Sequence, residues 1–189
     1  MSVSVRVAQR LETLPESSAI ALRIRADNYF DTIRGILDSF GPSKNLDSIY
    51  VTSTIPSQSI VNALEVLEID LEKIYFVDCV SQFMMDATSK HDNAIYVESP
   101  TMLENVMLKV EYLIRKTIDR NDLVILDSIN SLAIHNSTKI LSEFLHMFVN
   151  NLRSKNAYAL IFSMEEYESD EIRNILNLVC DETISAAEV

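Results

Sequence analysis

Glycine is almost absent from this sequence, because Gly35 and Gly41 are the only two in 189 residues. Glycine-rich loops let backbone N–H groups close around a phosphate, so the chain has no conventional phosphate-binding loop. The first 43 residues also contain no lysine, the side chain that normally neutralises phosphate charge in such a loop. These two absences exclude the standard way of holding a nucleotide near the start of the chain.

Basic residues are also few, with 16 Lys and Arg against 28 Asp and Glu and a formal net charge of −12. Proteins gain most of their affinity for nucleic acids from Lys and Arg that neutralise phosphates. The nearest basic group, residues 115–120, alternates with an acid and apolar residues and is typical of a solvated helix end. We therefore expect no nucleic acid and no anionic membrane among the primary partners.

Long apolar runs are missing as well, and none approaches the ~20 residues that span a bilayer. Residues 1–18 show neither a long apolar core nor a small-residue cleavage site, so we predict no signal peptide. Cys79 and Cys180 lie far apart, each between apolar neighbours. This usage favours reduced, buried thiols in a cytoplasmic protein.

What the sequence does contain is a series of short apolar runs rich in Ile, Val, Tyr and Phe. They are apolar throughout and do not alternate, as expected for parallel strands that are covered on both faces. The predicted strands are residues 19–24, 48–51, 74–77, 94–97, 123–126 and 158–162. The length suits one domain over residues 1–189, in which residues 1–17 form an N-terminal extension that fits either a helix or a strand.

Segments with apolar residues three to four positions apart separate these runs and predict helices. Pro56 and Pro100 are placed to open two of them, and Thr101 with Glu104 can form a capping box in the second. The pair Gly41–Pro42 is a stop signal for the helix that follows the first strand. Such alternation predicts the α/β class, as a three-layer α/β/α sandwich around a mostly parallel sheet.

In open α/β sheets ligands bind at the carboxyl ends of the strands, so the residues after each run are informative. The run 123–126 leads into Asp127 and Ser128, and the run 74–77 leads into Asp78. Asp127 can bind magnesium or can be a strand-end carboxylate that accepts local hydrogen bonds. Asp78 can be a second acid beside it or a residue that forms a turn, which we favour.

Several quoted segments together resemble the KaiC/RadA branch of the RecA-like P-loop ATPases. They are "SIYVTSTIPSQSIVNALEVLEIDLEKIYFVDCVS" (48–81), "NAIYVESPTMLENVMLKV" (93–110), "NDLVILDSINSL" (121–132), "AYALIFSMEE" (157–166) and "LVCDETI" (178–184). The similarity covers roughly residues 18–185. It implies a RecA-like sheet in which residues 121–132 form the Walker B strand, a central strand of the sheet. In that family, Asp127 would hold magnesium.

The sequence departs from that family where the first strand meets the first helix. A working member has Gly-x-x-x-x-Gly-Lys-Thr/Ser there, whereas this chain reads "IRADNYFDT" (24–32). Tyr29 and Phe30 stand roughly at the Gly-Lys positions, so their rings would fill a phosphate cradle. Asp27 and Asp31 would repel a polyphosphate, and Thr32 matches the magnesium-binding hydroxyl only loosely.

A second departure follows the second strand, where KaiC-like ATPases carry a Glu that activates the attacking water. Here Ser53 and Thr54 occupy that turn, and a hydroxyl is a poor general base near pH 7. We therefore predict a domain with no catalytic residues and no cofactor, acting as a regulatory or protein-interaction module. Its partner would be another protein, or a second copy bound through the edges of the fold, as relatives assemble.

The alternative is an atypical nucleotide-binding protein or slow ATPase with Mg-ATP in a vestigial site. That site would use Arg25 or Arg23 for the phosphates together with Thr32 and Ser128, and Asp127 for the metal. We favour a structural role for the arginines, as ion-pair partners of Asp127 or Asp78. The acidic run 164–171 is interpreted as a solvated loop, and the three histidines show no zinc-ligand spacing.

Overall fold

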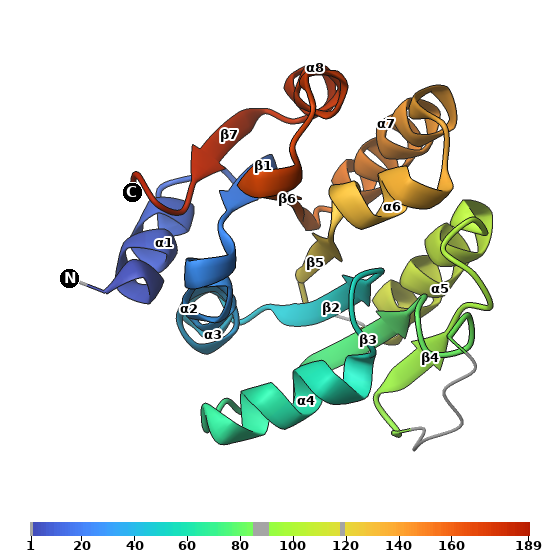
Figure 1. The fold of residues 1–189 in the computed structure, drawn as a ribbon. Helices are drawn as coiled ribbons and strands as arrows, with labels where there is room; N and C mark the ends of the chain where they lie inside the picture. Colours follow the sequence, from blue (N-terminus) through green and yellow to red (C-terminus); the bar gives the residue numbers. More distant parts are fainter. Residues whose placement is uncertain (1, 85–90, 118–119) are drawn as a thin grey trace.

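A computed structural model describes residues 2–84, 91–117 and 120–189 of the chain. Its centre is a seven-stranded, fully parallel sheet with the order β4-β3-β2-β5-β6-β1-β7 (Figure 1). The strands are β1 (Ala19–Ile24), β2 (Asp47–Thr52), β3 (Ile74–Asp78), β4 (Ala94–Tyr96), β5 (Asp122–Asp127), β6 (Tyr158–Met164) and β7 (Glu182–Ser185). Each predicted strand is present within about two residues, and β5 is the central strand, as predicted.

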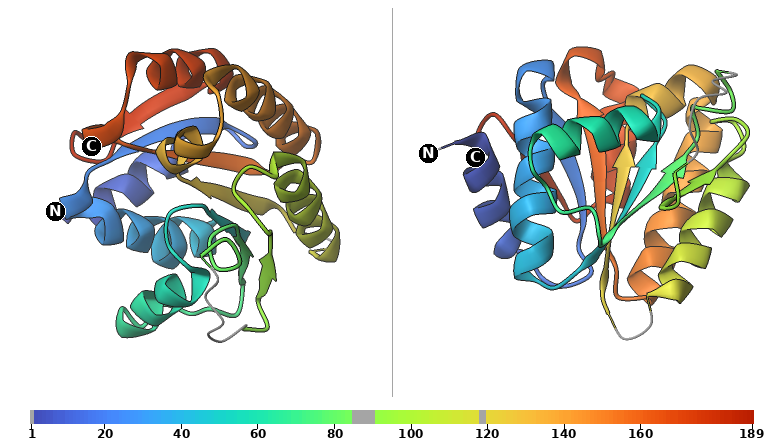
Figure 2. Two further views of the ribbon diagram at one scale, coloured as in Figure 1. Left: turned by 45° about the vertical axis from the view of Figure 1, so that its right-hand side comes forward. Right: turned by 90° about the horizontal axis from the view of Figure 1, so that it is seen from below.

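Helices cover both faces of this sheet, which gives the three predicted layers (Figure 2). One face carries α5 (Leu103–Lys116), α6 (Ile129–His135), α7 (Thr138–Ser154) and α8 (Asp170–Val179). The other face carries α1 (Val3–Glu12), α4 (Ser57–Val66) and a continuous helical run made of α2 (Tyr29–Arg34), η2 (Gly35–Phe40) and α3 (Gly41–Ser43). Two short turns of 3₁₀ helix, η1 (Ala26–Asn28) and η3 (Glu165–Tyr167), follow β1 and β6.

The inner strands are buried on both faces, because successive side chains enter the two cores in turn. In β2, Ile49 and Val51 pack under α5 and α7, whereas Tyr50 enters the core under α2 and α4. This double coverage explains why the runs are apolar throughout and do not alternate. It also places the Tyr50 side chain on the face of the sheet that α2 and the loop after β1 cover.

The first residues of the chain form a helix that is packed into the second core. In α1, Val7, Ala8 and Leu11 are buried. Its backbone lies so close to the helical run after β1 that a Cβ at Gly35 would meet the Ser4 carbonyl oxygen at 2.4 Å. A side chain at position 35 would therefore clash with α1, so the two helices can approach this closely only because residue 35 is glycine.

Two local predictions about helix ends are wrong. Thr101 and Glu104 form no capping box, because α5 begins at Leu103 and the Thr101 hydroxyl lies 2.9 Å from that of Ser99. The helical run after β1 continues through Gly41–Pro42 to Ser43. Pro42 fits there because the run changes at Gly41 from a π-helix to an α-helical turn, and a proline is tolerated in the first turn of an α-helix.

The basic group 115–120 is described only in part, since residues 118 and 119 lie outside the described residues. Helix α5 ends at Lys116, as predicted for a solvated helix end, and Arg120 pairs with Asp47 at 3.2 Å. Cys79 is buried and Cys180 half-buried, both as free thiols. No helix within the described part of the chain has the length and apolar character needed to cross a membrane.

Candidate functional site

The candidate site is built around Asp127, the last residue of the central strand β5. Its side chain is fully buried, and all three groups that bind it are hydroxyls. Tyr29 and Tyr50 both donate to Oδ2, Tyr50 at 2.6 Å, and Thr54 donates to Oδ1 at 3.0 Å. The Asp127–Ser128 peptide bond is cis. The carboxylate thus has a partner on each oxygen without any cation.

Burial dominates the electrostatics of this cluster. It raises the pKa of Asp127 above its ordinary value, and the hydrogen bonds from Tyr29, Tyr50 and Thr54 oppose that rise only in part. Burial and the neighbouring Asp127 also raise the pKa values of both tyrosines, so they remain protonated donors. Three neutral hydroxyls therefore occupy the positions around Asp127 from which a metal ion would be bound.

Three backbone N–H groups of the loop after β1 already have partners within the protein. The Arg25 N–H donates to the Asn28 side chain at 2.9 Å, and the Asn28 N–H donates to the Arg25 carbonyl at 3.1 Å. Between them, the Ala26 N–H donates to the Glu166 carboxylate at 3.0 Å. A phosphate cradle needs such N–H groups free and convergent. Here a carboxylate from the end of β6 binds at the loop instead.

Tyr29 begins α2 directly after this loop, and its hydroxyl donates to Asp127. Phe30 packs edge-on against Tyr29 and is partly exposed, with 44% of its surface accessible. Thr32 is fully buried, and its hydroxyl donates to the Asn28 carbonyl at 2.8 Å within its own helix. The Thr32 hydroxyl is therefore bound within its own helix, whereas the prediction placed it beside a metal ion.

The predicted ion pair between an arginine and Asp127 or Asp78 is wrong. Arg25 lies 3.5 Å from Asp27 at the surface, and Arg23 lies 3.1 Å from Glu168, a contact without hydrogen-bond geometry. The tyrosine hydroxyls take the place that we assigned to an arginine. They do so at lower cost, because burying a neutral hydroxyl costs less than burying a guanidinium.

The acidic run after β6 is only partly the solvated loop that the sequence predicted. Glu166 and Asp170 are exposed, but the Glu168 side chain is only 1% exposed. Glu168 binds Arg173 at 3.1 Å and accepts from the Ser163 hydroxyl at 3.1 Å. The run is therefore anchored over the ends of β1 and β6.

Asp78, at the end of β3, is the turn-forming residue that we favoured. Its Oδ1 accepts from the backbone N–H groups of Val80 and Ser81, at 2.9 and 2.8 Å. Its Oδ2 accepts from the Ser57 N–H and from the hydroxyls of Ser57 and Ser81. Burial acts to raise its pKa, but these hydrogen bonds together hold the pKa below its ordinary value. The carboxylate joins the end of β3 to the first turn of α4.

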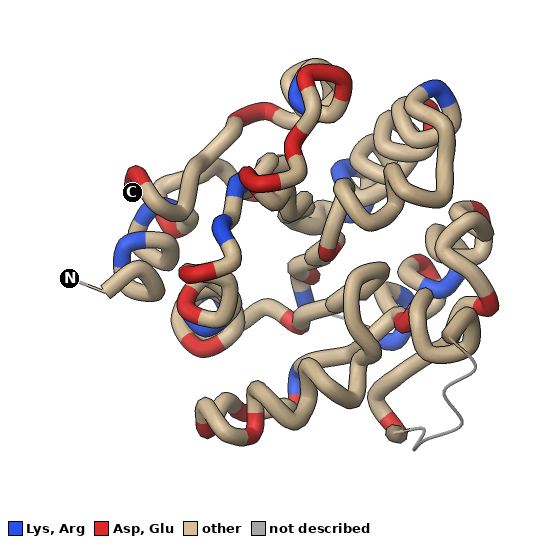
Figure 3. The backbone as a smooth tube through the Cα atoms, viewed as in Figure 1, with Lys and Arg blue, Asp and Glu red and all other residues tan. Residues whose placement is uncertain are grey.

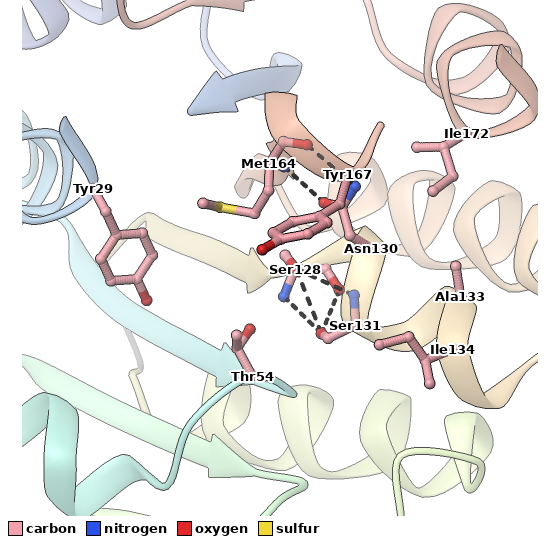
Figure 4. Close-up of a pocket in the computed structure, with 10 residues that line it drawn as sticks. All are labelled: Tyr29, Thr54, Ser128, Asn130, Ser131, Ala133, Ile134, Met164, Tyr167 and Ile172. Atoms are coloured by element: carbon pink, nitrogen blue, oxygen red, sulfur yellow. Dashed lines mark hydrogen bonds between the residues drawn. The ribbon is translucent and has the colours of Figure 1, made fainter. Parts of the chain in front are cut away.

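A pocket of about 450 Å³ opens beside Asp127 (Figure 4). Its lining is Tyr29, Thr54, Ser128, Asn130, Ser131, Ala133, Ile134, Met164, Tyr167 and Ile172. The polar members are tied to the protein itself: Asn130 accepts from the Met164 N–H at 2.7 Å, and the Ser131 hydroxyl lies 2.5 Å from that of Ser53. Apolar side chains therefore supply most of the free surface.

Of the predicted site residues, the structure brings only Asp127 and Ser128 to this pocket, Asp127 behind its wall and Ser128 in the lining. Arg25 and Thr32 do not line it. Among the residues that the structure describes, no three His, Cys, Asp or Glu side chains gather as a possible metal site. If a magnesium ion bound here, Asp127 would be its carboxylate ligand, but the three hydroxyls would first have to move away.

Tyr50 is the residue that sequence reasoning missed. It stands inside an apolar run and was interpreted as strand core. Its position was nevertheless informative, because it lies two residues before Thr52, which pairs with Asp127 across β2 and β5. A tyrosine is long enough to reach the next level of the sheet.

Comparisons with known proteins agree with this architecture. The family model described as "ATPase: KaiC" matches residues 41–188, a range that includes Asp127 but begins after the loop that holds Tyr29. The fold is similar to the crystal structure of a KaiC-like protein from the hyperthermophilic archaeon Pyrococcus horikoshii OT3, with a TM-score of 0.64 and 14% identity over 91% of this chain and 72% of that chain. No curated protein matches the sequence. Because the family model matches well over half of the chain, the protein belongs to the KaiC ATPase family, with a RecA-like fold.

Proposed function

We propose that this chain is a non-catalytic KaiC-like domain that works as a regulatory or protein-interaction module. The observation that supports the proposal is that the protein's own groups bind Asp127 and the loop after β1. Tyr29 and Tyr50 donate to Asp127, and Glu166 accepts from the Ala26 N–H where a phosphate would accept. A polyphosphate would have to displace a carboxylate and break these bonds without any lysine to compensate.

The turn after β2 supports the same proposal from the side of catalysis. Phosphoryl transfer depends on electrostatic positioning of the phosphates and on a group that orients the attacking water. The turn offers Ser53 and Thr54, and both hydroxyls already bind the Asp127 backbone carbonyl, at 3.1 and 3.0 Å. Neither is a base of suitable pKa, so the chain has no group to activate water there.

The second candidate is an atypical nucleotide-binding protein or slow ATPase. It is favoured by the family itself and by the position of Asp127 at the end of the central strand. Arg25, about half of whose side chain is exposed, would then turn from Asp27 towards a phosphate. Tyr29 would have to leave Asp127 so that Mg-ATP could enter.

Thermal unfolding with and without Mg-ATP separates these two functions. A ligand at 100 times its dissociation constant adds ~2.7 kcal/mol, which for a domain of this size raises the melting temperature by roughly 5–10 °C. We expect no shift at millimolar Mg-ATP. The matched control is Asp127→Asn, which removes the charge that a magnesium ion would bind. A shift in the wild type that this variant abolishes would establish the nucleotide binder and contradict the non-catalytic assignment.

A further inference from the structure

The pocket beside Asp127 has the wrong chemistry for a polar ligand. Most of its hydroxyl and amide groups already hydrogen-bond within the protein, as Thr54 does with Asp127 and Asn130 does with Met164. A polar ligand would have to compete with these bonds, whereas an apolar group can cover them without leaving a donor unsatisfied. The lining therefore favours an apolar occupant.

The rim of the pocket contains apolar side chains that the fold leaves uncovered. Ile134 on α6 is 78% exposed and Tyr167 on η3 is 74% exposed, and both line the pocket (Figure 4). Aromatic and aliphatic residues that rim a pocket in this way are typical of the anchor sites of protein interfaces. The pocket opens onto the surface and is not sealed within the core, which suits a side chain presented by another protein.

Two of the segments that supply the rim of the pocket are acidic, although the lining itself contains no Asp or Glu. The two segments that supply Tyr29, Tyr167 and Ile172, residues 23–31 and 164–173, contain seven acids and three arginines. Figure 3 shows these acids along η1 and α2, along η3 and at the start of α8. Helix α6, which supplies Ile134, contains no Lys or Arg. With seven acids against three arginines, these two segments of the rim have a formal net charge of −4, the same sign as the net charge of the chain.

We infer that this pocket is the docking site for a protein segment that presents an apolar side chain flanked by lysine or arginine. Charge complementarity selects this occupant, since it would steer a basic segment towards the acidic rim. A second copy of this chain would bring the same acids to face each other, and an anionic membrane would be repelled. The inference rests on the proposed function, because it names the kind of partner that such an interaction module would bind.

The test uses the whole chain and a defined probe. A fluorescently labelled peptide of about 14 leucine and lysine residues, arranged with helical period, presents an apolar face with basic flanks. A peptide of the same composition in scrambled order has the same charge without that face. We expect the wild type to bind the first peptide at least tenfold more tightly than the scrambled one in fluorescence anisotropy.

Variants of exposed residues then locate the binding surface. Ile134→Ser with Tyr167→Ser should weaken binding at least tenfold, whereas Val66→Ser with Leu178→Ser, equally exposed residues outside the pocket lining, should not change it. Asp170→Asn with Glu171→Gln should weaken binding several-fold and reduce its salt dependence. The matched control is Glu65→Gln with Glu72→Gln, which removes the same charge from the region of α4.

Each other outcome contradicts the inference in its own way. Equal binding of both peptides, or no binding, leaves no role for the apolar pocket. Equal binding by the pocket variant places the peptide elsewhere.

A wild-type dimer that Ile134→Ser with Tyr167→Ser dissociates in sedimentation identifies a second copy as the occupant. An uncharged aromatic compound that competes with the peptide regardless of salt identifies a small-molecule site. A Mg-ATP melting shift contradicts the proposed function alone, because the peptide measurements contain no nucleotide.

Discussion

Two acids stand at the same level of the sheet, on either side of β2, and the protein treats them differently. Thr52 pairs with Asp78 on one side and with Asp127 on the other. Asp78 is held largely by backbone N–H groups from the following turn and from α4, whereas Asp127 is held by three side-chain hydroxyls. The pKa of Asp78 is lowered and that of Asp127 is raised. Backbone donors cannot turn away, but hydroxyls can rotate and exchange roles as donor and acceptor.

This difference separates a structural carboxylate from a replaceable one. Asp78 holds the turn after β3, so we expect the stability of the fold to depend on its charge. Asp127 ends the central strand, and it is surrounded by groups that could adapt to its loss. Four measurements would break or sharpen that contrast.

The largest effect is expected from Asp78→Asn. The amide would turn an N–H₂ group towards donors that are fixed in the backbone, such as the Ser57 or Ser81 N–H. An unsatisfied buried donor costs ~1–3 kcal/mol, so we expect a loss of about 3 kcal/mol in the free energy of unfolding. Urea denaturation measures this. A loss under about 1 kcal/mol would mean that Asp78 is as replaceable as Asp127.

An intermediate effect is expected from Tyr50→Phe. Tyr50 is fully buried, so water cannot replace its hydroxyl on Asp127 Oδ2. We expect a loss of about 1–2 kcal/mol in urea denaturation. Tyr29→Phe is the matched control, since Tyr29 is partly exposed and lines the pocket. If Tyr29→Phe loses more free energy of unfolding than Tyr50→Phe, the hydroxyl of Tyr29, and not that of Tyr50 on β2, contributes most to holding the Asp127 carboxylate.

The smallest effect is expected from Asp127→Asn, with a change under about 1 kcal/mol near neutral pH. The rotatable hydroxyls of Tyr29, Tyr50 and Thr54 can accept from the new amide.

The pH dependence of the two variants should be opposite in sign. Because the folded pKa of Asp127 is raised, its contribution to stability is lost as pH rises from about 4 through that pKa. Asp127→Asn should therefore gain stability relative to the wild type between pH 4 and pH 8. Because the folded pKa of Asp78 is lowered, its stabilisation is lost as pH falls, and the penalty of Asp78→Asn should shrink below about pH 4. Parallel pH profiles for both variants would contradict the comparison.

Much of the fold was predictable because β1, β2, β3, β5 and β6 are largely buried on both faces and are therefore apolar along their length. The pattern was weaker in two places, because α6 has only seven residues and residues 1–17 matched both helix and strand patterns. The capping-box prediction was wrong because Ser99 and Thr101 hydrogen-bond to each other before α5 begins.

The site was predictable in position but not in chemistry. A strand ending in Asp127 identified the central strand, and Tyr29 was expected in the phosphate loop. The partner of Asp127 was not predicted, because an arginine is the obvious counter-charge whereas Tyr50 looks like core. The position of Glu168 was missed for a related reason, since a run of acids resembles a solvated loop when its arginine partners come from other elements.

The contact at Gly35 gives one of the two glycines of this chain a purely spatial purpose. Its Cα faces the backbone of Ser4 with no room for a methyl group between them. In a phosphate loop a glycine makes room for a ligand from solution, whereas this one makes room for the chain's own first helix. Any side chain at position 35 would force α1 outwards, so a single hydrogen atom fixes how closely the N-terminal helix can join the domain.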